Sequence, residues 1–93
     1  MAHTLESVEP GTPVFAGDAC IGRVRAAFSE GNSRSVELLV VHHDARGEDV
    51  VVPSSEIEAV DDAGVQLMSR RADEYRDLAP FDAARFPTMK QLK

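Results

Sequence analysis

The stretch that decides the fold is the segment at residues 36–42, which reads VELLVVH. In an extended strand, side chains two residues apart point to the same face. Leu38 and Val40 therefore share one face of this segment. Leu39 and Val41 share the opposite face, and that face is apolar as well. A strand of this kind has to be covered on both sides, so we expect it at the centre of a β-sheet.

Residues 20–28, which precede this segment, alternate between apolar and basic side chains. Arg23 and Arg25 share one parity, which is typical of the solvent face of a half-buried strand. Glycine inside such a run indicates a bend or a close backbone contact. The residues expected on the buried face are Gly22, Val24, Ala26 and Phe28.

Short apolar runs and turn residues continue to residue 68, a pattern typical of a small sheet closed into a barrel. Asp61 and Asp62 come before Gly64, and aspartate is favoured in turns because its carboxylate accepts backbone hydrogen bonds. We therefore expect a mainly β fold, a small β-barrel of about six short strands. Besides the two segments above, its strands are expected at residues 14–16, 49–52, 57–60 and 65–68.

After residue 68 the pattern changes to that of a short helix and an extended tail. Ser69 is placed to cap a C-terminal helix over residues 70–78, which Pro80 ends. The predicted domain covers residues 1–79, with its core from residue 10 onward. Residues 80–93 form a tail that packs on the barrel or on a partner chain. The helical stripe that would face the barrel consists of Ala72, Tyr75 and Leu78.

Composition limits the function further. A chain of 93 residues is long enough for one core, and its net charge of −6 repels phosphate backbones, so nucleic-acid binding is disfavoured. No apolar run approaches the length that spans a bilayer, and no leader pattern is visible, so we expect a cytoplasmic protein without membrane insertion. Cys20, the one cysteine, lies in an apolar run and is expected to be buried.

The sequence offers no recognisable catalytic, cofactor or metal site, so we expect a non-enzymatic protein without a cofactor. No nucleophile elbow or phosphate-binding glycine motif is present. His42 and His43 are adjacent on a strand, so they point to opposite faces and do not easily share one metal ion. We expect His42 to end the strand and His43 to be solvated. A gathering of arginines on one side is an alternative to an ordinary solvated face, and its members would be Arg23, Arg25, Arg34 and Arg46.

The order of these segments resembles the PRC-barrel family. The residues that carry the resemblance are Gly11-x-Pro13-Val14-Phe15, Ile21-Gly22-Arg23-Val24, Leu38-Leu39-Val40-Val41, Val51-Val52-Pro53 with Ile57, and Asp61-x-x-Gly64-Val65-x-Leu67. They span residues 10 to 80. The resemblance implies a compact barrel followed by a short helix, and a role as an adaptor that docks on other proteins. It brings no catalytic residues.

We therefore expect a protein–protein interaction module that forms a homodimer and has a further, unknown protein partner. A ribosome- or RNA-processing-associated adaptor is the first alternative, and a small-ligand-binding barrel is the second. The phenylalanines of the tail either fold back over their own barrel or cross to a neighbouring chain. The residues expected at the interface are Leu39, Val41, Tyr75, Phe81, Phe86 and Met89.

Overall fold

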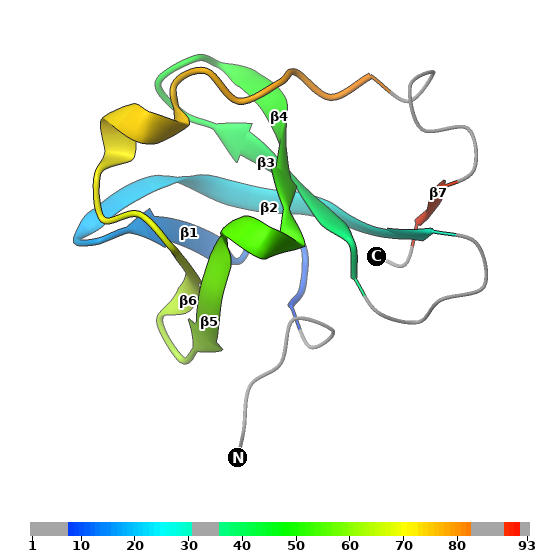
Figure 1. Ribbon diagram of the computed structural model, residues 1–93, viewed down its shortest axis with the longest axis horizontal. Helices are drawn as coiled ribbons and strands as arrows, with labels where there is room; N and C mark the ends of the chain where they lie inside the picture. Colours follow the sequence, from blue (N-terminus) through cyan, green and yellow to red (C-terminus); the bar gives the residue numbers. More distant parts are fainter. Residues whose placement is uncertain (1–7, 31–35, 83–88, 92–93) are drawn as a thin grey trace.

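The structure is a computed structural model that describes residues 8–30, 36–82 and 89–91 (Figure 1). Within this part of the chain the fold is mainly β, as the sequence predicts. The strands are β1 (Pro13–Ala16), β2 (Ala19–Glu30), β3 (Leu38–His43), β4 (Glu48–Pro53), β5 (Ile57–Asp61), β6 (Gly64–Leu67) and β7 (Met89–Gln91). Two short 3₁₀ helices, η2 (Ser54–Glu56) and η3 (Ala72–Tyr75), complete the described elements.

The strands form one sheet with the order β4-β3-β2-β1-β6-β5, and β7 pairs with β2 beside this path. The β1–β6 pair is parallel and the other pairs are antiparallel. No described pairing joins β4 to β5, so the sheet is open where the sequence predicts a closed barrel. The reason lies at the free edge of β4. There the Val51 N–H donates to the Ala79 carbonyl (2.9 Å) and the Phe81 N–H donates to the Asp49 carbonyl (2.9 Å).

The β3 strand is buried on both faces, which confirms the expectation from its sequence. Leu39 and Val41 are 0% exposed and belong to the main core, with side chains of β1, β2, β4 and β6. Leu38 and Val40 belong to a second apolar cluster on the opposite face. We call the face that carries Leu38 and Val40 the outer face of the sheet, and the other its inner face.

A β-bulge interrupts the alternation that the sequence shows along β2. Val24 pairs with Val41, but Ala26 pairs with Val40, so Arg25 is an extra residue on this strand. The bulge reverses the parity, because Val24 and Ala27 lie in the main core while Ala26 joins the outer cluster. The prediction that Val24 and Ala26 share a face was therefore wrong.

Three local predictions between residues 17 and 78 had different outcomes. The turn at Asp61 is confirmed, because its Oδ1 accepts hydrogen bonds from the N–H groups of Ala63 (2.8 Å) and Gly64 (3.2 Å). Cys20 was expected to be buried and is exposed. The helix expected over residues 70–78 is reduced to the single turn of η3, because so short a segment gains few helical hydrogen bonds.

Gly22 marks a close approach between β2 and β3, as its position in the sequence indicates. A Cβ atom at this residue would lie 1.9 Å from the carbonyl oxygen of His42 and 3.3 Å from the Cα of His43. Both contacts are to backbone, which cannot rotate away as a side chain can.

We predict that Gly22→Ala lowers the free energy of unfolding by about 2 kcal/mol or more, because the strands must separate to admit the methyl group. Gly47→Ala is the matched control. Gly47 has a positive φ of 65° but nothing within 4 Å of an added Cβ, so it loses about 1 kcal/mol from backbone strain alone. Urea unfolding followed by circular dichroism measures both, and equal losses would contradict the close approach.

Tyr75 holds η3 against the rest of the fold through its hydroxyl group. The hydroxyl accepts a hydrogen bond from the Ser69 N–H (2.8 Å) and donates to the Glu56 carboxylate (3.4 Å). Burial raises the pKa of Tyr75 above its ordinary value, and the nearby charges of Glu56 and Glu74 raise it further. The Tyr75 hydroxyl therefore stays neutral in the folded protein at a pH where the same hydroxyl is already ionised in the unfolded chain.

We predict a loss of stability at alkaline pH that depends on Tyr75. The folded pKa lies above the unfolded value of about 10, so this contribution is complete below pH 10 and falls as the pH rises further. Tyr75→Phe removes this pH dependence and lowers neutral stability by about 1 kcal/mol, because the Ser69 N–H loses its acceptor. Tyr75 is the only tyrosine and tryptophan is absent, so tyrosinate absorbance reports this one group. A titration at the ordinary tyrosine pKa would contradict the prediction.

Candidate interaction surface

The outer face of β2, β3 and β4 carries side chains in rows that cross the three strands. One row is polar and the next two are apolar, as the registers of the two antiparallel pairs show. From the polar row onward they are Arg23–His42–Asp49, Ala26–Val40–Val51 and Phe28–Leu38–Pro53. The surface therefore changes from charged to apolar along the strands.

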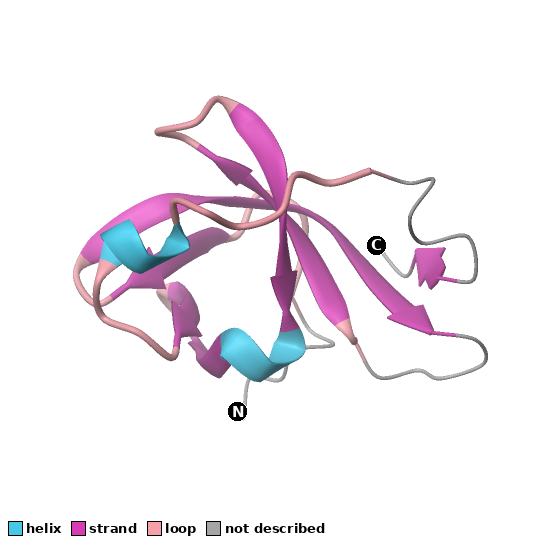
Figure 2. Cartoon of the chain, turned by 45° about the horizontal axis from the view of Figure 1, so that its top comes forward, coloured by secondary structure: helices cyan, strands magenta, loops and turns pink. Residues whose placement is uncertain are grey.

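Residues 79–81, which we call the strap, lie along the edge of β4 and reach the apolar rows. Pro80 forms an isolated bridge with Val50, and the strap runs past β4 in two views of the molecule (Figures 1 and 2). The Phe81 ring packs on Phe28 with 5.4 Å between the ring centroids and an interplanar angle of 40°. The strap thus joins the outer cluster, in which Val40 is 2% exposed.

An arginine from the β3–β4 turn fixes the start of the strap. The Arg46 guanidinium donates to the carbonyl of Leu78 and also pairs with the Glu48 carboxylate. Its side chain is 23% exposed, so this contact is partly shielded from water. Arg46 therefore serves the strap and stands apart from the other arginines that the sequence grouped with it. Arg34 lies outside the described residues.

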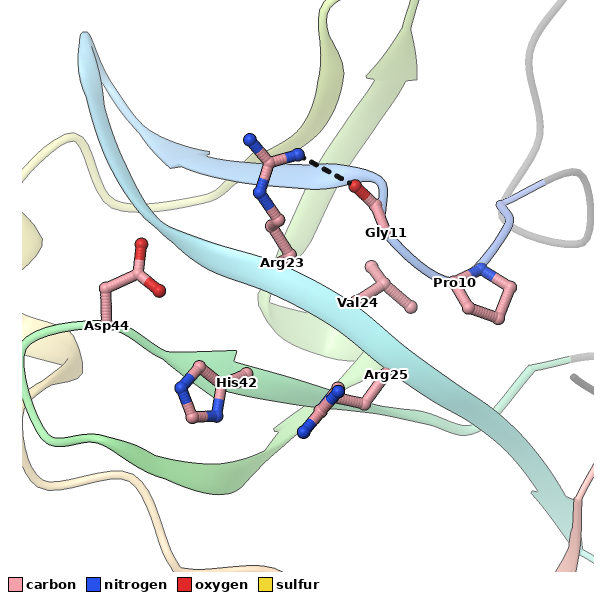
Figure 3. Close-up of a pocket in the computed structure, with 7 residues that line it drawn as sticks. All are labelled: Pro10, Gly11, Arg23, Val24, Arg25, His42 and Asp44. Atoms are coloured by element: carbon pink, nitrogen blue, oxygen red, sulfur yellow. Dashed lines mark hydrogen bonds between the residues drawn. The ribbon is translucent and has the colours of Figure 1, made fainter.

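A pocket of about 420 Å³ opens beside the polar row of the outer face (Figure 3). It lies where β2 passes β3 and the segment that leads into β1. Arg25 and His42 lie next to each other in this view, while Arg23 extends toward Gly11. The residues that line it are Pro10, Gly11, Arg23, Val24, Arg25, His42 and Asp44.

The basic side chains at this pocket have few acidic partners among the described residues. The Nδ1 atom of His42 lies 3.0 Å from Oδ1 of Asp49, and Nε of Arg25 lies 3.5 Å from the same oxygen. Arg23 donates from Nη1 to the Gly11 carbonyl at 3.1 Å. One carboxylate oxygen thus serves both Arg25 and His42, and Arg23 forms no ion pair within the described residues.

The two histidines lie on opposite faces, and their burial differs from what the sequence indicates. His42 is half-buried in the polar row, while His43 was expected to be solvated and is 3% exposed. His43 shares the inner face with Val41, and within the described residues neither of its ring nitrogens has a hydrogen-bond partner. In that same part of the chain, no group of three or more metal-ligating side chains is found.

The structure assigns the predicted interface residues to different places. Leu39, Val41 and Tyr75 lie in the main core. The expectation that they form an interface is therefore corrected, because their side chains are not available to another chain. The reason is that the strand register turns Leu38 and Val40, and not Leu39 and Val41, to the outer face. Phe81 packs on that outer face, as a fold-back of the tail requires.

The two remaining predicted interface residues lie near the end of the chain. Met89 begins β7, where it pairs with Glu30 of β2. Phe86 lies outside the described residues. Arg23 and Arg25, which the sequence places on one face, both line this pocket, but the bulge at Arg25 is not revealed by a strict two-residue period.

Comparisons of this chain with protein-family models, with curated proteins and with solved structures find no match. Among the described residues, no helix combines the length and the apolar character that crossing a bilayer requires. The resemblance to the PRC-barrel family therefore remains a prediction.

We predict that Phe81→Ala lowers the free energy of unfolding by about 1–2 kcal/mol, because the half-buried ring leaves the outer cluster. Binding of an apolar dye should increase as Leu38 and Val40 become accessible. Met68→Ala is the control, since Met68 is 57% exposed and belongs to neither apolar cluster. Thermal unfolding and dye fluorescence measure both variants, and an unchanged Phe81→Ala protein would show that the Phe81 ring does not stabilise the outer cluster.

Proposed function

We propose that this protein is a non-enzymatic interaction module with a PRC-barrel-like fold that self-associates through its outer face. The observation that carries the proposal is the second apolar cluster on the outer face of β2, β3 and β4. In a sheet that covers one core, the opposite face is ordinarily polar. Here the outer face is apolar over two rows, and the strap covers part of it.

The family part of the proposal rests on where the quoted motifs lie. Residues 21–24 are in β2, residues 38–41 are in β3, and residues 51–53 end β4. The sheet would need a β4–β5 contact to close as a barrel, and η2 connects these two strands directly. An adaptor role follows from the resemblance.

Exchange of the strap between two copies would give a homodimer at low energetic cost. Each strap would make the same contacts with β4 and Phe28 of the other copy, so the exchanged form repeats contacts that already exist. Residues 76–78, between η3 and the strap, would serve as the hinge. The apolar main core favours this module over a small-ligand barrel. The net charge of −6 favours it over an RNA-associated adaptor.

We predict that the protein forms dimers whose fraction rises with concentration in sedimentation velocity. In a sample that mixes isotope-labelled and unlabelled copies, nuclear Overhauser contacts between Phe81 and Phe28 should appear between chains. Phe81→Ser should lower the dimer fraction, while Met68→Ser, a matched change at an exposed site, should leave it unchanged. A monomer at all concentrations would overturn self-association. A dimer without the intermolecular Phe81–Phe28 contact would refute strap exchange.

A further inference from the structure

The strand β5 forms an edge of the sheet that no described segment covers. The sheet order ends at β5, and its described strand partner is β6. Within the described residues, no backbone hydrogen bond joins residues 58–61 to a segment other than β6. Alternate residues of an antiparallel edge strand turn their N–H and C=O groups outward. β5 therefore offers hydrogen-bonding groups to a further strand, whereas the strap occupies the edge of β4.

A β-bulge places two neighbouring side chains of β5 beside one hollow. The register with β6 shifts between Ile57 and Ala59, so Glu58 is an extra residue on this strand. Regular alternation would put Glu58 and Ala59 on opposite faces, but both line a hollow of about 310 Å³. Both residues are exposed. The edge of β5 and this hollow therefore form one accessible surface.

The charges that line the hollow do not balance. Its acidic residues are Asp18, from the β1–β2 turn, with Glu58 and Asp61 of β5, and its basic residue is Arg70. Three carboxylates and one guanidinium give the lining a net formal charge of −2. Within the described residues, none of Asp18, Glu58 and Arg70 forms an ion pair. The carboxylates of Asp18 and Glu58 thus keep their oxygens for a cationic group.

The edge and the charge together select the occupant. Outward N–H and C=O groups fit an extended segment, which adds to a sheet by main-chain hydrogen bonds. Charges on an edge oppose pairing with a second copy, since Glu58 and Asp61 of both copies would meet, but they attract a segment of opposite charge. The exposed methyl group of Ala59 lines the same hollow, so the methylene stem of a lysine can pack there.

We infer that β5 accepts an additional strand from a basic, extended segment of a partner protein. The main chain of that segment pairs with the edge of β5, and one of its lysine or arginine side chains enters the hollow and reaches Asp18 and Glu58. The inference rests on the proposed interaction module and names the chemistry of its further partner. It uses β5 and the hollow, whereas self-association uses the outer face and the strap.

The test is a nuclear magnetic resonance titration of the full chain with a blocked peptide of alternating lysine and threonine. Amide resonances of residues 58–61 should shift and show nuclear Overhauser contacts with the peptide. The same peptide with every backbone nitrogen methylated keeps its charge, cannot donate to a strand and should not bind. Asp18→Asn with Glu58→Gln should weaken binding by about three- to tenfold, as expected for two exposed ion pairs. Asp61 is left unchanged because its Oδ1 accepts hydrogen bonds in the β5–β6 turn.

The control is Glu37→Gln with Asp44→Asn, which removes the same charge from two exposed residues outside the hollow. This pair should change the affinity by less than about twofold, since screening in salt weakens distant charges. Equal losses in both double variants would overturn the inference, and so would equal binding of the methylated peptide. A protein that forms the Phe81–Phe28 dimer but does not bind the lysine peptide would overturn this inference alone and leave self-association intact.

Discussion

The fold depends on one constraint, the burial of β3 on both of its faces. Four consecutive apolar residues in an extended strand put two side chains on each side of the sheet, and none of them gains from contact with water. The inner pair is covered by the strands that curve around the main core. The outer pair needs a second cover, to which the strap, near the end of the range 36–82, contributes. Burial of these four residues thus depends on both the main core and the strap.

The strap also explains why the sheet stays open. An edge strand has unpaired N–H and C=O groups, and something must satisfy them or shield them. At β4 the partners are Ala79 and Phe81, which occupy the edge that β5 would need for a closed barrel. The same short segment therefore ends the sheet and covers its outer face. Arg46 donates to the carbonyl of Leu78, the residue just before the strap, so the β3–β4 turn also contacts the approach to the strap.

Much of this architecture could be predicted from the sequence, because runs of apolar residues between turn residues report where strands begin and end. The face of the sheet to which each side chain points was predicted less well than the positions of the strands. The bulge at Arg25 adds one residue to β2, and alternation alone gives no sign of it. His43 looked like a solvated strand end, yet the register places it opposite Gly22 on the inner face. Both errors concern tertiary register, to which local patterns are blind.

The pocket shows how such a register detail produces a surface with chemical character. Arg23 and Arg25 share one parity, so a regular strand would also place them on one face. In the structure Arg25 is the extra residue of the bulge beside the Arg23–His42 pair, where β3 and the segment before β1 supply the remaining walls. Oδ1 of Asp49 is shared between Nε of Arg25 and Nδ1 of His42. Strand pairing thus brings Arg23 and Arg25 together with Asp44 and Asp49, an arrangement that composition alone would have hidden.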